Sequence, residues 1–338
     1  NKGLTATAFV PASGLNPTDL LYDDDFKSNV YAAFGQLAFD VTDQLELALA
    51  LRYDSEDRAV DNNVPRCTTT NTAICRAQTP DFSFFSRPFI NPAYTVNPSF
   101  ATNGIPSRST TFSQLQPKFS ANWKANDDFA VYASYGYGFR SGGFNSSGSA
   151  ATVNTNYGRA GSTVLCLGAS FLPPTCGANA VLNITDVNDT YRKEVSKAAE
   201  LGFKSFFLDR RLSVNAAVYH TKVEDMQFFN FFAGPFGLLR VVTNIDEVTI
   251  KGFELDGRWR VNNNVSVFAA YSTTDGNIDK YVGRPYTAGG EVPYAPKYTG
   301  NAGVDFELPF GGSDWVVNAR VDASFVGETW FHPVQKQR

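Results

Sequence analysis

The sequence predicts an all-β protein, an antiparallel transmembrane β-barrel. Three observations indicate this fold. Segments of about ten residues alternate between apolar and polar side chains, short and long connections alternate between the segments, and aromatic residues stand near the segment ends. About ten extended, tilted residues are enough to cross the apolar part of a bilayer. Along the 338 residues we identify about ten such strands, arranged as five hairpins.

The clearest strand runs from Leu45 to Asp54. Its apolar side chains, from Leu45 to Leu51 and Tyr53, occupy every second position, and charged residues such as Arg52 lie between them. Successive side chains of a strand point to opposite faces. This segment therefore has one apolar and one polar face.

The same alternation predicts nine more strands. They are residues 31–40, 113–123, 129–140, 195–207, 212–224, 249–260, 265–271, 298–307 and 315–326. The turns within hairpins are short, at 42–44, 126–128, 208–211, 262–264 and 309–312, and the connections between hairpins are long, at 57–111, 141–190, 225–245 and 276–296. Outer-membrane barrels have short turns at one end and long loops at the other. A soluble sandwich has no reason to place every long connection at one end.

The two faces of these strands fit a barrel. The polar face would line a wet lumen with charged side chains, which are Glu46, Arg52, Lys118, Lys204, Glu254, Arg258, Asp305 and Arg320. Aromatic residues near strand ends, which membrane interfaces favour, are Tyr31, Trp123, Trp259, Tyr271 and Trp315. A soluble sandwich would alternate in the same way, so alternation alone leaves both folds open.

Composition excludes several classes of function. The net charge is −4, so the chain offers no broad basic surface for nucleic acid. Without an apolar run of about 18 residues, we expect no transmembrane helix. The two histidines, His220 and His332, are far apart, and no hydrolase or phosphate-loop motif is present. We therefore expect no enzyme, no metal site and no cofactor.

The four cysteines form two local pairs, Cys67 with Cys75 and Cys166 with Cys176. Four cysteines allow three pairings. Each pair lies in a long polar segment, and a metal site is disfavoured because the spacing is wide and no histidine is near. We predict one disulfide within each pair, which implies an oxidising compartment.

Several segments resemble TonB-dependent outer-membrane receptors of the siderophore-receptor type. In family order they are Tyr31–Gln36 with Leu51–Tyr53, Leu115–Lys118 with Val131–Tyr135, Gly138–Asn145, Glu194–Lys204, Lys251–Leu255 and Ala295–Tyr298. The resemblance spans most of residues 28–333. It implies a barrel of about 22 strands in the cell outer membrane of a Gram-negative bacterium. It also implies active import of a scarce nutrient, foremost a ferric siderophore, with outer-membrane lipid, TonB and the small ligand as partners.

The chain also departs from that family. We find neither a TonB box nor a plug domain, and residues 336–338 are not the aromatic end of a last barrel strand. We therefore interpret residues 1–338 as the central part of a barrel domain, with the plug, the early strands and the last strands missing.

Residues in the predicted loops and upper lumen are candidates for ligand binding. They are Phe84, Phe85 and Arg87 in connection 57–111, Phe229, Phe232 and Arg240 in connection 225–245, and Arg140 at the end of a strand. Aromatic rings stack and guanidinium groups pair with negative charge, so together they suit an anionic, aromatic chelate. The alternative is structural: the rings pack the loops together, and Arg140 forms an ion pair.

Three further functions stay open. The barrel could be a passive porin or another barrel without a plug. It could also be a TonB-dependent receptor for carbohydrate, cobalamin or aromatic compounds. A soluble all-β binding or carbohydrate-active protein is the third alternative.

Overall fold

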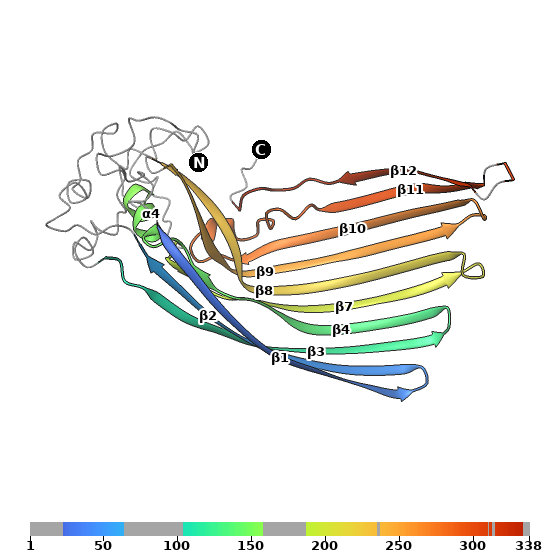
Figure 1. Ribbon diagram of the computed structural model, residues 1–338, viewed down its shortest axis with the longest axis horizontal. Helices are drawn as coiled ribbons and strands as arrows, with labels where there is room; N and C mark the ends of the chain where they lie inside the picture. Colours follow the sequence, from blue (N-terminus) through green and yellow to red (C-terminus); the bar gives the residue numbers. More distant parts are fainter. Residues whose placement is uncertain are drawn as a thin grey trace.

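A computed structural model describes residues 23–63, 104–157, 187–234, 237–309, 311–312 and 315–333. Within them, ten strands form one antiparallel sheet in which neighbours in space are also neighbours in sequence (Figure 1). The strands are β1 Asp24–Thr42, β2 Leu45–Asn62, β3 Arg108–Asn126, β4 Phe129–Arg140, β7 Glu194–Phe207, β8 Leu212–Gly234, β9 Gly237–Arg260, β10 Val265–Lys280, β11 Tyr298–Pro309 and β12 Val316–Val326. The predicted antiparallel all-β fold is confirmed.

Four smaller elements lie between these strands, and they are β5 Gly143–Phe144, α4 Ser149–Tyr157, β6 Thr190–Tyr191 and the 3-10 turn η3 Pro285–Thr287. β5 and β6 pair with each other as a separate small sheet. Among the described residues, no helix is long and apolar enough to cross a membrane.

The five predicted short turns lie at one end of the sheet (Figure 1). In three of them, at 42–44, 126–128 and 262–264, a short polar side chain accepts backbone hydrogen bonds. Thr42 Oγ1 accepts hydrogen bonds from the backbone N–H groups of Gln44 and Leu45, at 3.2 and 3.0 Å. Asn126 Oδ1 accepts one from the N–H of Asp128 at 2.9 Å. Such side-chain-to-backbone bonds replace a backbone turn, which explains why these residue types mark the hairpins.

The strands continue further than predicted towards the end with the long connections. β8 runs to Gly234 and β9 begins at Gly237. The prediction of a loop at 225–245 is therefore wrong, because residues 225–234 and 237–245 continue the two strands of a hairpin. Side-chain alternation fades there, whereas the backbone ladder that defines a strand does not depend on alternation.

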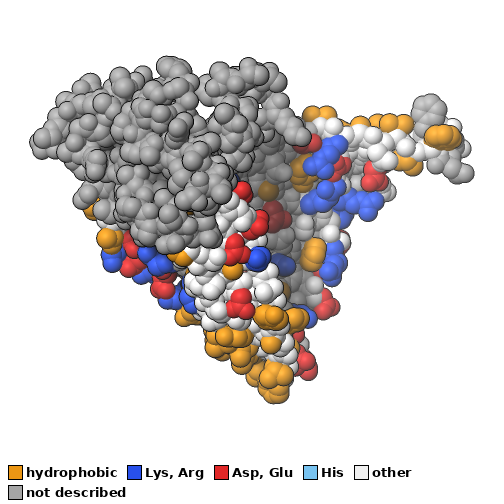
Figure 2. Space-filling model, turned by 60° about the vertical axis from the view of Figure 1, so that its left-hand side comes forward, with side chains coloured by type: hydrophobic (Ala, Val, Ile, Leu, Met, Phe, Trp, Pro, Cys, Tyr) orange, Lys and Arg blue, Asp and Glu red, His pale blue; other side chains and the backbone are white. Residues whose placement is uncertain are grey.

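The cross-strand register confirms that the charged residues predicted for the lumen share one face, here called the polar face. Lys118 lies opposite Ala50 and Gly136, for example, and Lys204 lies opposite Ala130 and Asn215. Arg258 pairs with Asp305 at 2.6 Å on this face. Figure 2 shows basic and acidic side chains close together over the hollow between the two edges of the sheet.

The other face, here called the apolar face, stays exposed. Leu49, Leu51 and Phe119 on it are all more than 40% exposed. The predicted interface aromatics Tyr31, Trp123, Trp259, Tyr271 and Trp315 are exposed as well. The buried apolar side chains of the described residues form clusters at the end with the long connections instead. This distribution fits a sheet with lipid against its apolar face, and does not fit a sandwich that buries that face.

Candidate ligand site

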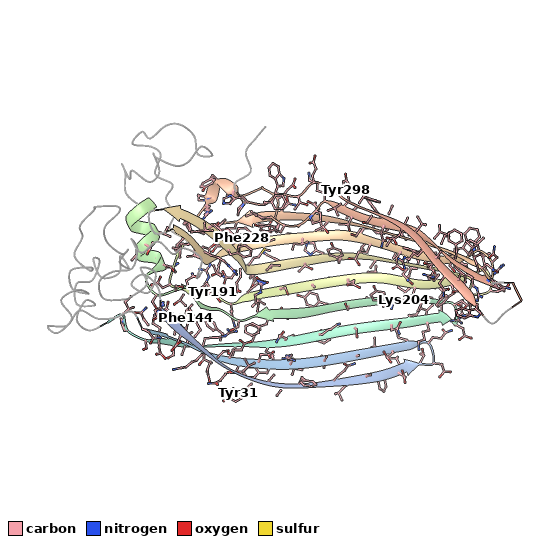
Figure 3. All side chains as sticks on the ribbon, turned by 45° about the horizontal axis from the view of Figure 1, so that its top comes forward. Tyr31, Phe144, Tyr191, Lys204, Phe228 and Tyr298 are labelled. Carbon is pink, nitrogen blue, oxygen red and sulfur yellow. The ribbon has the colours of Figure 1, made fainter. Side chains whose placement is uncertain are left out.

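The structure describes four of the seven predicted ligand residues, Arg140, Phe229, Phe232 and Arg240. Phe84, Phe85 and Arg87 lie outside the described residues. So do Cys67, Cys75, Cys166 and Cys176, and both disulfides stay predictions. Figure 3 shows the end of the sheet in question, where Phe144, Tyr191 and Phe228 are labelled.

The central element of this region is the β8–β9 extension, which we define as residues 225–234 and 237–246. It begins where the pairing of β9 with β10 ends, at Glu247 and Lys280. At its base the ladder steps from the pair Glu224–Glu247 to the pair Met226–Ile245, and Asp225 has a φ of 55°. This irregularity leaves Asp225 and Asp246 unpaired in the ladder, at the base of the extension.

Arg192, which follows β6, connects these two aspartates. Its Nη2 lies 2.7 Å from Asp225 Oδ1 and 3.1 Å from Asp246 Oδ1. Hydrogen bonding to Asp225 is the main cause that raises the pKa of the Arg192 guanidinium above its usual value, so this charge persists at all physiological pH. The side chain of Asn244 also bonds both the N–H and the C=O of Arg192, at 2.7 and 3.0 Å. The base of the extension is thus fixed to the segment that enters β7.

Phe232 lies on one face of the extension, and its ring is buried. It packs with Leu239 and Val241 against Val153 and Val187, in and near the segment that carries α4. A ring that is 6% exposed has little surface to offer a ligand. Phe232 therefore packs the extension against its neighbours. This agrees with the structural alternative, in which the aromatic rings pack the connections together.

Phe229 and Arg240 lie on the opposite face. With Phe231, Tyr294 and Phe331 they form what we call the aromatic platform. Phe229 contacts Phe231 edge-on, with ring centroids 5.6 Å apart, and its centroid is 6.0 Å from that of Tyr294. Tyr294 in turn contacts Phe331 at 5.7 Å. All four rings are at least 36% exposed, and such an exposed aromatic surface is typical of a recognition site.

Arg240 supplies the charge of the platform. Its guanidinium carbon lies 4.8 Å from the ring centroid of Phe229, within the range of a cation–π interaction. It forms no ion pair with a carboxylate among the described residues. The platform thus combines stackable rings with an available positive charge.

Arg140 has a different environment. Its Nη1 lies 3.3 Å from Glu194 Oε2, and the same carboxylate accepts a hydrogen bond from the backbone N–H of Gln227 at 2.7 Å. Arg140 therefore takes part in a structural ion pair that links the end of β4 to the base of the extension. We leave it out of the ligand site.

Sequence reasoning missed the segment that supports this region. Asn145 donates from Nδ2 to the C=O of Val242 at 2.8 Å and accepts at Oδ1 from the N–H of Val242 at 2.7 Å. One side chain thus takes the place of a neighbouring strand along the free edge of β9. Asp189 accepts hydrogen bonds from the N–H groups of Gly148 and Ala150 at the start of α4, which is helix capping by a distant residue.

Antiparallel strands with an exposed apolar face, a charged opposite face and all short turns at one end define the class of membrane-spanning β-barrel domains. The model of the TonB-dependent receptor-like β-barrel family matches residues 2–336. The chain belongs to this family.

Two solved structures have a similar fold. One is the ferric yersiniabactin uptake receptor FyuA from Yersinia pestis, with 16% identity and a TM-score of 0.57 over 92% of this chain and 36% of that one. The other is the copper transporter OprC, with 18% identity and a TM-score of 0.50 over 84% of this chain and 33% of that one. The chain therefore spans about a third of the length of these proteins. At such identities the likeness concerns the fold alone.

Proposed function

We propose that this chain is part of the barrel of an outer-membrane transporter that imports an anionic, aromatic ligand, foremost a ferric siderophore. The observation that carries the proposal is the aromatic platform, where Arg240 lies over Phe229 without a carboxylate partner among the described residues. A ferric chelate with aromatic groups offers flat rings and negative charge, which rings and a guanidinium recognise together.

Family membership supports active rather than passive transport. We expect the longer protein to supply the plug, the segment that contacts TonB and the remaining strands. Ligand binding at the platform would then be the first step, and the inner-membrane proton gradient would supply the energy through TonB. FyuA, the structural neighbour named above, is an uptake receptor for a ferric siderophore, which agrees with this class of ligand.

The test is uptake of labelled ferric siderophores by cells that express the full-length protein under iron limitation. We expect Arg240→Gln and Phe229→Ala each to raise the siderophore concentration for half-maximal uptake by about three- to tenfold, as for loss of a partly desolvated cation–π contact. Arg260→Gln, which removes a charge at the opposite end of β9, is the matched control and should leave uptake unchanged.

A protonophore distinguishes active from passive transport. Uptake that stops when the proton gradient is dissipated supports the transporter, and uptake that continues identifies a passive barrel. If Arg240→Gln and Arg260→Gln behave alike, the platform is not the ligand site.

A further inference from the structure

The apolar face of the sheet changes abruptly to charged residues in the direction of the long connections. Along β8 the outward positions are Val218, His220, Lys222 and Glu224 in that order. β9 repeats this order in the same direction, with outward positions Phe253, Lys251, Thr249 and Glu247. Glu247 lies directly opposite Glu224. On both strands the first ionised position after the apolar residues is basic, and the acidic position lies further out.

The basic positions lie together across three strands. Lys197 of β7 is directly opposite Lys222 of β8, and His220 is directly opposite Lys251. The like charges of Lys197 and Lys222 repel each other in these positions. Each lysine keeps one carboxylate partner: Lys197 contacts Glu224 at 2.5 Å, Lys222 contacts Glu247 at 2.9 Å, and Lys251 contacts Asp275, directly opposite it on β10, at 3.1 Å. One carboxylate occupies only part of an ammonium group, which has three N–H donors.

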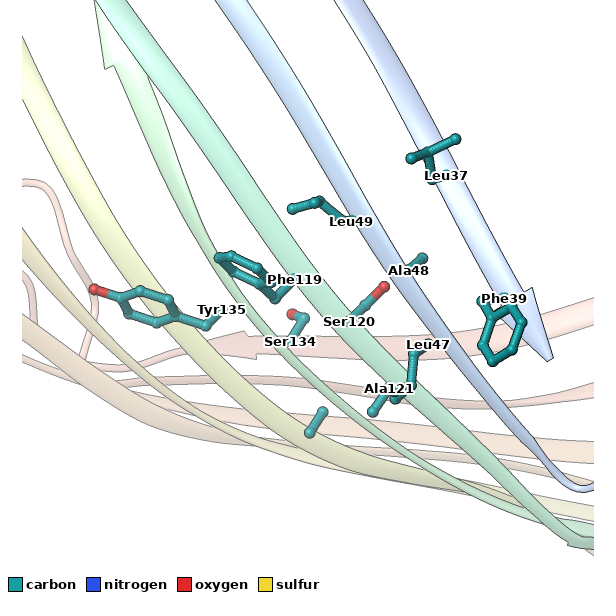
Figure 4. A pocket seen from close by; sticks show the side chains of 11 residues that line it. Leu37, Phe39, Leu47, Ala48, Leu49, Phe119, Ser120, Ala121, Ser134 and Tyr135 are labelled. Carbon is teal, nitrogen blue, oxygen red and sulfur yellow. The ribbon is translucent and has the colours of Figure 1, made fainter. Parts of the chain in front are cut away.

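A groove of about 550 Å³ lies on the apolar face, nearer the short turns than this basic group. It is formed by four adjacent strands, β1 to β4 (Figure 4). The small side chains Ala121 and Ala133 line it, together with larger ones such as Leu37, Phe39 and Tyr135. Almost all of its outward side chains are apolar, so it suits a hydrocarbon chain.

Two tyrosines connect the groove to the lysines. Tyr135 lines the groove and contacts Tyr137 edge-on at 5.9 Å. Tyr137 is directly opposite Lys197, whose Nζ lies 5.7 Å from its ring centroid. The separation of Lys222 from Ala133 has two parts. At ordinary strand dimensions it is roughly 13 Å along the strand direction and roughly 10 Å across the two strand spacings from β4 to β8. A membrane lipid is long enough to span this separation.

We propose that this face holds one anionic, phosphate-bearing membrane lipid, with its phosphate on Lys197 and Lys222 and a hydrocarbon chain in the groove. The order of charges on β8 and β9 fits this occupant, because phosphates lie immediately beyond the hydrocarbon layer, at the level of Lys222 and Lys251, and Glu224 and Glu247 lie further into water. The proposal rests on the membrane placement in the proposed function and does not depend on the imported ligand.

The experiment measures lipid retained by the full-length protein, purified in detergent, by native mass spectrometry. Phosphatidylglycerol and phosphatidylcholine with identical chains are added separately. We expect the unmodified protein to retain more phosphatidylglycerol, and the double variant Lys197→Gln with Lys222→Gln to lose that preference by about tenfold, as for two lysines beside an anionic headgroup. The matched control, Lys118→Gln with Lys204→Gln, changes two lysines of the polar face and should keep the preference.

A second variant tests the groove. Ala121→Leu with Ala133→Leu fills it without touching a charge, and should reduce retention of both lipids equally. The proposal is overturned if the unmodified protein shows no preference for phosphatidylglycerol, if the Lys197 and Lys222 variant behaves as the control does, or if filling the groove changes nothing. Siderophore uptake is measured separately, so a protein that retains the lipid but imports no siderophore would overturn the proposed function alone.

Discussion

Single residues explain two of the motifs that the sequence shares with the family. Gly202 lies directly opposite Tyr132, and Gly252 lies directly opposite Tyr219, both on the polar face. In each pair the tyrosine ring leans over the glycine, so closely that a Cβ atom there would overlap the ring. Covering a strand glycine with a cross-strand aromatic ring restores packing that the missing side chain would otherwise lose.

Gly252→Ala should therefore destabilise the barrel. The new Cβ would meet the C=O of Thr273 as well as the ring of Tyr219, and overpacking of this kind costs about 1–3 kcal/mol. The measurement is the temperature at which the full-length protein loses its heat-modifiable migration on gels. Gly35→Ala is the control, since a Cβ at Gly35 meets nothing within 4 Å. Equal temperatures for the two variants would contradict the packing role of Gly252.

Asn145→Ala should expose the edge of β9. Val242 would lose both its donor and its acceptor partner, and an unmade buried hydrogen bond costs about 1–3 kcal/mol. We expect exchange of the Val242 amide hydrogen to accelerate by about tenfold or more in hydrogen-exchange mass spectrometry. Asn215→Ala, which removes only a side-chain contact with Asp256, should leave that peptide unchanged. Slow exchange in Asn145→Ala would show that another group protects this edge.

At the scale of strands, the sequence predicted those parts of the fold that side-chain alternation controls. Alternation is strong only where one face meets lipid and the other meets water. Alternation therefore predicts the ten strands and their short turns, while its loss in the continuation of β8 and β9 predicts a loop there. Nothing local in Asn145 or Asp189 indicates their partners, because Asn145 is 97 positions from Val242.

The candidate site shows the same limit. Phe229 and Phe232 were predicted together as ligand residues of one loop. In a strand, an odd and an even position point to opposite faces, and the structure accordingly exposes Phe229 and buries Phe232. Recognising residues 225–245 as a hairpin would have separated the two. The position of Tyr294 and Phe331 next to Phe229 depends on distant connections that no sequence pattern reveals.

The base of the β8–β9 extension gives a prediction about a whole element. Arg192→Gln would leave Asp225 and Asp246 near each other without their shared cation. Because Arg192 is about half exposed, we expect local loosening rather than loss of the barrel. Limited proteolysis of the full-length protein should cut the extension faster, with an unchanged gel shift on heating. A protected extension in this variant would mean that Asn244 and the other contacts suffice to hold it.

At the scale of the whole molecule, the central feature is the arrangement of the two faces of the sheet. The apolar face meets lipid, and the polar face lines an interior. The register supports this arrangement, since in the part of the sheet nearer the short turns one face collects the charged side chains while the other is apolar and exposed. The proposed lipid site takes its position from this arrangement. It also explains why the buried clusters of the described residues lie at the end with the long connections.

Spin labels along β8 test this arrangement most directly. Labels are placed one at a time from position 212 to 219 in the full-length protein, reconstituted in membranes, with Cys67, Cys75, Cys166, Cys176 and any further native cysteine replaced by serine. We predict that Leu212, Val214, Ala216 and Val218 collide with oxygen dissolved in the lipid, and that Ser213, Asn215, Ala217 and Tyr219 collide instead with a water-soluble nickel complex. Equal access of both reagents to both sets, or the reverse alternation, would contradict a barrel with its apolar face in the membrane.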